Sequence, residues 1–374
     1  MTAIPPAAVG MALEEVDTPA LLIDLDSFER NLRRLADAVE GTPVRLRPHA
    51  KTHKCPTIAL KQMALGAVGV CCQKVGEAEA MVNGGVPNVL VSNEIVGASK
   101  VARLAALARH AEVMVCADDP LHVEQLSEAA QAFSVELPVL VEVDVGAPRC
   151  GVAPGQPALE LARRIEGAPG LRFGGLQAYQ GAAQHLRPIA ERKEAIQAAV
   201  HRVRECLELF ERDGIPCERV SGAGTGTYPF ERDSGVYTEL QAGSYVFMDA
   251  DYAQNLAEDG APVSTFEHSL FVYTTVMSRP IPERAVVDAG LKAYTLEMGK
   301  PWVHGMPDVE VVGVSDEHGA LHLSDPSRDL RLGRKLMLIP GHCDPTVNLH
   351  DWYVCIRGGR VEALWPISAR GAIT

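Results

Sequence analysis

Short apolar segments alternate with amphipathic helical segments over the first two thirds of the chain, and this alternation restricts the possible folds more than any other feature. Helical patterns separate the segments, including a long one over residues 188–214. Strands joined through helices pair in parallel, with right-handed crossovers. Eight such units predict an α/β fold built as a (β/α)₈ TIM-type barrel, which typically takes about 250 residues. The predicted strands are 20–24, 44–50, 67–72, 88–93, 112–118, 139–145, 172–179 and 218–224.

An open doubly wound sheet is the competing architecture for the same alternation. Its dinucleotide-binding version carries a G-x-G-x-x-G turn after the first strand. No such turn follows residues 20–24, so we expect the barrel, with boundaries at residues 20–253.

The pattern of apolar residues changes after about residue 255. Segments with alternating apolar and polar residues, rich in β-branched side chains, replace the strand–helix units there. Gly358-Gly359 stands between two of these segments and predicts a tight hairpin. Residues 254–374, together with residues 1–19, are therefore expected to form a C-terminal antiparallel β-domain. The predicted β segments are 269–278, 284–290, 308–324, 335–341 and 352–367.

Composition excludes several classes of protein. The 374 residues carry a net charge of −13 without a Lys/Arg cluster, which argues against a nucleic-acid partner. No segment approaches the roughly 20 apolar residues of a membrane span, and the first residues lack the pattern of a signal peptide. The nine cysteines are scattered and form no C-x-x-C pair, as in proteins with reduced thiols. We expect a cytoplasmic protein without a membrane partner.

Lys51 follows the second predicted strand, within the segment RPHAKTHK (47–54). Reactive groups of a barrel lie where strands end at its C-terminal rim. Nearby cations and desolvation would lower the pKa of such a lysine and make it a nucleophilic amine. The alternative is a solvated surface lysine.

Two turns of small residues follow the eighth predicted strand, at 221–227 (SGAGTGT) and 242–245 (AGSY). Backbone N–H groups and hydroxyls of such loops can bind an anion, and barrels often bind phosphate near strands 7 and 8. The alternative is an ordinary tight turn.

A His-x-Asp triplet lies in the β-domain, in the segment GHCDPT (341–346). Pro345 favours an extended Asp344, and residues two apart in an extended segment point to the same side. His342 and Asp344 would then face a divalent ion together and leave open positions for substrate. The alternative is a loop histidine beside a turn aspartate.

Several separated segments together resemble the bacterial D-threonine aldolases and, equally, the 3-hydroxy-D-aspartate aldolases. Both groups belong to the fold-type III, alanine-racemase-like class of pyridoxal-phosphate enzymes. The resemblance runs over nearly the whole chain. Its segments are 17–26 (DTPALLIDLD), 47–54, 71–75 (CCQKV), 142–152 (EVDVGAPRCGV), 175–181 (GLQAYQG), 222–227, 239–249 (ELQAGSYVFMD) and 341–351 (GHCDPTVNLHD).

The resemblance implies a role for each matching position. Lys51 matches the lysine that carries pyridoxal phosphate, His185 is a catalytic histidine on the substrate side, and Arg149 lies near the pyridine nitrogen. His342 and Asp344 match the metal ligands, with Mn²⁺ expected first and Mg²⁺, Co²⁺ or Zn²⁺ as alternatives. The remaining implied cofactor contacts are Gln73, Tyr179, Gly224, Thr225, Gly226, Thr227, Gly243, Ser244 and Tyr245. Ala223 departs from related loops, which often carry a third glycine there.

The implied reaction is retro-aldol cleavage of D-β-hydroxy amino acids, from D-threonine to glycine and acetaldehyde or from 3-hydroxy-D-aspartate to glycine and glyoxylate. A β-eliminating dehydratase of D-serine or D-threo-3-hydroxyaspartate is the alternative. Those relatives carry cysteine as the second metal ligand, and Asp344 in that place favours the aldolase. Non-catalytic pyridoxal-phosphate-binding proteins of this fold lack the β-domain. The class also implies a homodimer and a small-molecule substrate.

Overall fold

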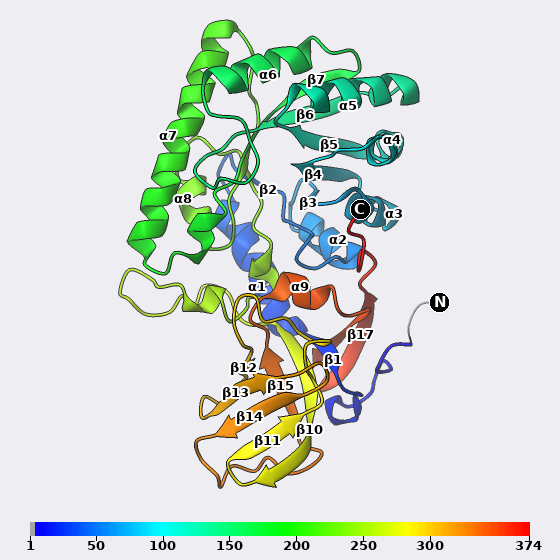
Figure 1. Cartoon of the computed structure of the whole chain (residues 1–374), viewed down its shortest axis with the longest axis vertical. Coiled ribbons are helices and arrows are strands. Elements are labelled where there is room, and N and C mark those ends of the chain that lie inside the picture. The colour runs from blue at the N-terminus through cyan, green and yellow to red at the C-terminus, as the bar shows by residue number, and fades with distance from the viewer. Residues whose placement is uncertain (1–3) are drawn as a thin grey trace.

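A closed sheet of eight parallel strands forms the upper part of the molecule in Figure 1. The structure is a computed structural model that describes residues 4–374. The strands run in the order β2-β9-β8-β7-β6-β5-β4-β3, and a backbone bridge between His49 and Cys71 joins the two ends. The predicted barrel is therefore confirmed. Its strands are β2 (Arg45–Leu46), β3 (Val70–Cys72), β4 (Asn88–Glu94), β5 (Glu112–Ala117), β6 (Leu137–Glu142), β7 (Leu171–Ala178), β8 (Val220–Gly222) and β9 (Glu239–Leu240).

Helices between successive strands cover the outside of the barrel. Helix α5 shows why these segments are helical. Asp119 accepts a hydrogen bond from the backbone N–H of Leu121 at 2.8 Å and so caps a helix whose first residue is Pro120. Its buried residues recur at helical spacing and pack on the barrel. The helices are α1 (Leu25–Val39), α2 (Pro56–Ala64), α3 (Val75–Asn83), α4 (Ala98–Leu107), α5 (Pro120–Phe133), α6 (Gln156–Glu166), α7 (Ile189–Asp213) and α8 (Tyr228–Arg232).

The first predicted barrel strand lies in the other sheet, which corrects the sequence analysis. Strand β1 (Ala20–Asp24) pairs antiparallel with β10 (Leu270–Ile281) and parallel with β16 (Trp352–Arg357). The eighth barrel strand is instead β9, which has two residues and no apolar run. A buried strand has the same pattern in either sheet, so only its long-range pairing shows where it belongs. We therefore expect the domain boundary to follow β1 rather than to precede it.

The second sheet has nine strands in the order β11-β14-β13-β12-β15-β10-β1-β16-β17 and forms most of the lower part in Figure 1. Its pairings are antiparallel apart from that of β1 with β16. Gly358 and Gly359 connect β16 to β17 with φ of 55° and 74°, as the predicted hairpin requires. The other elements are β11 (Arg284–Val287), β12 (Trp302–Val303), β13 (Val309–Val314), β14 (Gly319–Leu323), β15 (Lys335–Ile339), α9 (Cys343–Val347), β17 (Arg360–Pro366) and the short 3₁₀ helices η1 (Leu13–Glu15), η2 (Ala182–His185), η3 (Ser244–Val246) and η4 (Tyr252–Gln254).

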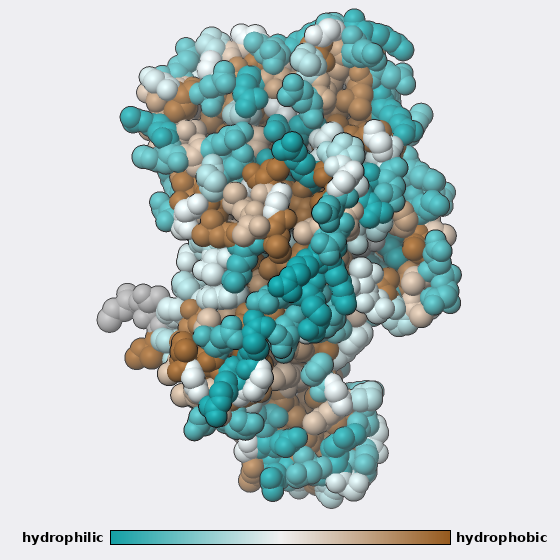
Figure 2. All heavy atoms as spheres, turned by 180° about the vertical axis from the view of Figure 1, so that it is seen from behind, coloured by the Kyte–Doolittle hydropathy of each residue, from teal (hydrophilic) through white to brown (hydrophobic). Residues whose placement is uncertain are grey.

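The surface seen from behind mixes hydrophilic and hydrophobic residues over both parts of the molecule (Figure 2). The large apolar clusters lie inside instead, one within the barrel and its helices and another between α1 and the second sheet. Among residues 4–374, no helix combines the length and the apolar character that crossing a membrane requires.

A buried ion pair joins the neighbouring strands β2 and β9, between Arg47 directly after β2 and Glu239 in β9. The guanidinium Nε of Arg47 donates to Glu239 Oε2 at 2.8 Å, and the two side chains are 1% and 7% exposed. Removing one member of such a pair leaves an uncompensated charge, so Glu239→Gln should lower the free energy of unfolding by about 3–5 kcal/mol. The exposed pair of Arg172 and Glu136 gives a matched control, because Glu136→Gln should cost less than about 1 kcal/mol. Equal losses in urea unfolding would contradict this prediction.

Candidate active site

A cavity of about 330 Å³ opens at the C-terminal ends of the barrel strands, where the second sheet meets the barrel. Most of the predicted site residues line it, although they come from distant parts of the chain. These are Lys51, Gln73, Arg149, Tyr179, His185, Gly224, Thr225, Gly243, Ser244, His342 and Asp344.

Lys51 lies in the turn after β2 and points toward the β-domain. Its Nζ is 3.3 Å from Oδ2 of Asp344, which belongs to α9. This carboxylate raises the pKa of Lys51, whereas the sequence predicted a lowered one. The sequence shows only the cationic residues that flank Lys51. It could not show the effect of Asp344, which approaches Lys51 only in the folded chain.

His342 and Asp344 face the same cavity, but not through an extended segment. His342 is extended, with φ of −141° and ψ of 131°, whereas Asp344 already lies in the first turn of α9. Pro345 does not keep Asp344 extended, because the first helical turn needs no N–H from proline. His342 Nε2 lies 3.9 Å from Asp344 Oδ1, and Glu297 Oε1 lies 2.9 Å from His342 Nδ1. The two ligand types together suit a divalent ion.

The glycine-rich loop meets the cavity through Gly224 and Thr225, as predicted. Thr225 Oγ1 is buried and has no hydrogen-bond partner in the described part of the chain. A buried hydroxyl without a partner can donate its hydrogen bond to a ligand acceptor such as a phosphate oxygen. Ala223 adopts φ of 72°, a left-handed conformation that glycine adopts without strain, which explains the glycine of related loops.

Three predicted phosphate contacts, Gly226, Thr227 and Tyr245, are not among the residues that line this cavity, and their contact with a phosphate stays a prediction. The N–H of Gly226 donates to Gln184 Oε1 at 2.9 Å, and the hydroxyl of Thr227 donates to Glu231 at 2.8 Å. The hydroxyl of Tyr245 is buried and accepts a hydrogen bond from the amide of Gln62. In the structure, the Gly226 and Thr227 bonds tie the glycine-rich loop to Gln184 and Glu231. A glycine-rich pattern shows that a loop is tight but not which of its groups face inward.

His185 is held by an aspartate that the sequence analysis missed. Asp251 Oδ2 lies 2.6 Å from His185 Nδ1, and Asp251 also pairs with Arg187. The pairs with His185 and Arg187 hold the pKa of Asp251 below its usual value in spite of burial. A carboxylate that binds Nδ1 leaves Nε2 free to accept a proton. Asp251 lies two residues after the recognised segment 239–249. This proximity to the motif is the one sequence feature that could have identified Asp251 as a site residue.

The cavity lining also includes a neutral histidine, His49, and a cation, Arg149, near the ring of Tyr179. His49 Nε2 lies 3.0 Å from Gln73 Oε1, and burial, followed by the charge of Lys51, lowers the pKa of His49 to about 3. The guanidinium carbon of Arg149 lies 5.7 Å from the ring centre of Tyr179. His49 stands within the recognised segment 47–54, but nothing in its pattern separates it from its neighbours.

Two family models match the chain: "Alanine racemase, N-terminal domain" over residues 23–251 and "Putative serine dehydratase domain" over residues 269–356. The chain is 48% identical over 370 residues to a 3-hydroxy-D-aspartate aldolase of Paracoccus denitrificans, covering 98% of this chain and 95% of the relative. It is also 48% identical over 367 residues to a D-threonine aldolase of an Arthrobacter species, covering 98% and 96%. The chain belongs to this aldolase family. The resemblance and the alanine-racemase-like fold predicted from the sequence are confirmed.

A solved relative supports the same assignment. The crystal structure of a D-threonine aldolase from Filomicrobium marinum matches with a TM-score of 0.96 and 49% identity, covering all of both chains. A D-threo-3-hydroxyaspartate dehydratase of a Delftia species is more distant, at 28% identity over 96% of both chains. The protein is therefore an enzyme of the aldolase type, a carbon–carbon lyase.

The aldolase family implies pyridoxal phosphate as cofactor, and the cavity of this aldolase fits it. The cavity has the size of small-molecule sites, and Lys51 is one of the residues that line it. The unpartnered hydroxyl of Thr225 lies among small residues of the glycine loop, where a phosphate would be bound.

Glu231 lies behind the glycine loop of the aldolase and makes stability depend on pH. Burial raises its pKa from 4.5 to about 8, so the folded protein holds a proton that the unfolded chain releases. Stability is therefore lost as pH rises from about 4.5 to about 8. Glu231→Gln keeps an acceptor for Thr227 and removes the titration. The variant should gain on the order of a few kcal/mol over the wild type between pH 5 and 8 in urea unfolding. A constant difference across this range would contradict the prediction.

Proposed function

We propose that this enzyme cleaves the Cα–Cβ bond of D-configured β-hydroxy amino acids and releases glycine and an aldehyde. D-threonine would yield acetaldehyde, and 3-hydroxy-D-aspartate would yield glyoxylate. The observation that carries the proposal is the convergence of Lys51, His185, His342 and Asp344 on one cavity. This cavity combines the amine of Lys51 for the cofactor, His185 as a base, and two side chains that can bind a metal ion.

When bound, pyridoxal phosphate supplies an electron sink for the bond that breaks at Cα. Lys51 would carry the cofactor, because its amine lines the cavity at the barrel rim. Thr225 would donate its unpartnered hydroxyl to the phosphate, beside Gly224 and Ser244. Arg149 is our candidate for the partner of the ring nitrogen, and Gln73 and Tyr179 line the same cavity.

His342 and Asp344 would hold a divalent ion, with Mn²⁺ expected first and Mg²⁺, Co²⁺ or Zn²⁺ next. Such an ion would lower the pKa of the substrate hydroxyl. His185 then accepts the hydroxyl proton at Nε2, because Asp251 occupies Nδ1. The aspartate also stabilises the charge that the imidazole gains.

The dehydratase alternative is less consistent with the site. The resemblance places a cysteine as second ligand in that class, whereas Asp344 lines the cavity here. Cys343 is fully buried and does not belong to the lining. The carboxylate therefore favours cleavage of the carbon–carbon bond over elimination.

A substrate panel tests the proposal. The purified enzyme, loaded with cofactor and Mn²⁺, is incubated separately with D-threonine, 3-hydroxy-D-aspartate, D-serine and L-threonine. Glycine plus aldehyde from the D-β-hydroxy substrates, with no product from L-threonine, supports it. Ammonia and a 2-oxo acid as the main products would show a dehydratase.

Asp251→Asn should lower kcat by roughly 10²–10⁴-fold with little change in KM, the range over which general acid–base catalysis acts. The amide keeps the shape of the side chain but loses the charge that orients and stabilises His185. The pH profile of kcat is the second readout, because a purely structural loss would not move it. Unchanged kcat would contradict the role of Asp251.

A homodimer and a cytoplasmic location complete the proposal. The homodimer follows from the resemblance, and light scattering of the purified protein tests it. All nine cysteines are unpaired in the structure, in agreement with a reducing compartment.

A further inference from the structure

A buried carboxylate, that of Asp249, connects two turns of the active site. Asp249 lies between η3 and η4, after the last barrel strand, and is fully buried. The N–H of Cys343, the first residue of α9, donates to Asp249 Oδ2 at 3.1 Å. The N–H of Tyr252, the first residue of η4, donates to Asp249 Oδ1 at 2.9 Å. One side chain therefore holds two turns that are far apart in the sequence.

The first of these turns carries the expected metal ligands, at residues 341–344. The residue before a helix usually accepts a hydrogen bond from the first turn through a side-chain oxygen. His342 occupies that position before α9 without such a bond, and its imidazole lines the cavity instead. Asp249 accepts the first N–H of α9 in its place. It thus holds the turn that contains Asp344 and leaves the imidazole of His342 available for a metal ion.

The second turn, at residues 249–252, carries the aspartate that holds the base. Asp251 directly precedes Tyr252, and its Oδ2 lies 2.6 Å from His185 Nδ1. The bond from the Tyr252 N–H to Asp249 closes this turn around Asp251. The position of Asp251, and through it that of His185, therefore depends on Asp249.

Backbone hydrogen bonds join the same two turns beside Asp249. The N–H groups of Ala250 and Asp251 donate to the carbonyl oxygens of Pro340 and Gly341, at 3.0 and 3.2 Å. Pro340 directly follows β15 of the second sheet, and α9 lies where that sheet meets the barrel (Figure 1). The metal-ligand turn and the Asp251 turn therefore form one unit across the boundary between the two parts of the molecule.

The chemistry of the two bonds requires a carboxylate at residue 249. Each oxygen of Asp249 accepts a hydrogen bond from a different backbone N–H. An amide of the same shape has one acceptor oxygen, and its NH₂ group only donates. With asparagine at this position, one of the two N–H groups would lose its acceptor in the protein interior, which is unfavourable.

We propose that Asp249 is a positioning residue for the cleavage reaction, which sets the metal ligands and the base in one geometry. The inference rests on the proposed function, since it concerns the metal pair His342 and Asp344 and the base His185. Asp249 does not line the cavity, so it acts through the two turns and not through contact with substrate.

Mn²⁺ binding to the cofactor-loaded enzyme tests this role without turnover. Free Mn²⁺ gives an electron paramagnetic resonance signal that disappears on binding, so a titration yields the Kd. Asp249→Asn should weaken Mn²⁺ binding roughly 10–100-fold, as loss of a group that orients metal ligands typically does. At saturating Mn²⁺ its kcat should still fall roughly 10²-fold, because a small displacement of the base is costly, while KM for D-threonine stays close to that of wild type.

Two control variants separate positioning from a general loss of stability. Glu297→Gln affects only the metal side, through His342, and should weaken Mn²⁺ binding but keep kcat near that of wild type. Asp288→Asn changes a carboxylate that accepts the N–H of Thr275 at 2.8 Å and does not line the cavity. It should lower the free energy of unfolding without changing the Kd of Mn²⁺. Unchanged Mn²⁺ affinity or unchanged kcat in Asp249→Asn would overturn the inference, as would an equal effect of Asp288→Asn.

Hydrogen exchange of the wild type gives a measurement that needs no variant. Mn²⁺ should slow exchange in residues 249–254 as well as in residues 340–347, because both turns belong to one unit. Slower exchange in residues 340–347 alone would show that the metal-ligand turn moves independently and would overturn the inference, while the proposed function would stand. A wild type that binds no Mn²⁺ would refute the metal pair of the proposed function, and the role of Asp249 with it.

Discussion

Lys51→Arg is expected to lower kcat by roughly 10⁴-fold or more, as loss of a catalytic nucleophile does in other enzymes. Arginine keeps a positive charge beside Asp344, so the surroundings of the side chain change little. Its guanidinium, however, stays protonated and cannot bond covalently to the aldehyde of the cofactor. Steady-state kinetics with D-threonine and with 3-hydroxy-D-aspartate measures the loss.

Borohydride reduction and peptide mapping give the second readout for Lys51. The cofactor should be fixed to the peptide that contains Lys51 in the wild type and to no peptide in Lys51→Arg. Lys74→Arg changes an exposed lysine nearby and should retain full labelling and activity. A label on Lys54 or Lys74 in the wild type would refute the assignment of Lys51.

Local patterns in the sequence predicted most of the fold, because each depends only on neighbouring residues. The strand–helix alternation predicted the barrel, and the Gly358-Gly359 pair predicted the final hairpin. The membership of β1 and β9 could not be predicted this way. A five-residue strand with four buried residues fits both sheets, whereas a two-residue strand carries no periodic signal at all.

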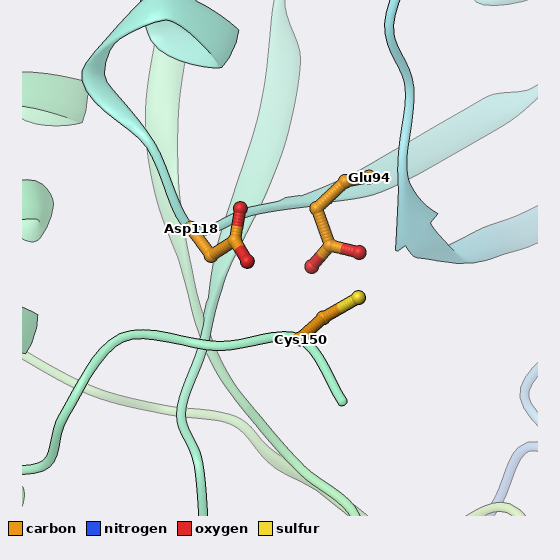
Figure 3. Close-up of side chains that lie close together, drawn as sticks. All are labelled: Glu94, Asp118 and Cys150. Carbon is orange, nitrogen blue, oxygen red and sulfur yellow. The ribbon is translucent and has the colours of Figure 1, made fainter. Parts of the chain in front are cut away.

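In the site, too, short sequence segments identified individual residues, whereas contacts between distant residues could not be predicted from them. Lys51, His342 and Asp344 were found from short segments, and the structure brings them to one cavity. The pairing of Asp344 with Lys51 and of Asp251 with His185 depends on the folded chain, so no local pattern contains it. The proximity of Glu94, Asp118 and Cys150 to one another is a similar case (Figure 3), since each residue alone is an ordinary strand-end or loop residue.

His342→Ala is expected to reduce kcat by about 10³-fold or more, while the cofactor stays attached to Lys51. The cost is large because a bound divalent ion lowers the pKa of a coordinated oxygen by several units, and His185 alone must then remove the hydroxyl proton. His342 makes no ion pair with Lys51, so this variant leaves the Lys51–Asp344 pair in place. Chelation of the wild type should have the same effect, and Mn²⁺ should restore activity to the wild type only.

Glu297→Gln provides a graded version of the same experiment. Glu297 Oε1 lies 2.9 Å from His342 Nδ1 and orients the imidazole without lining the cavity itself. Such outer partners typically contribute 10–100-fold to metal affinity, so this variant should need roughly that much more Mn²⁺ for half-maximal activity and reach a kcat close to that of wild type. Full activity of His342→Ala after exhaustive chelation would exclude a catalytic metal at this pair.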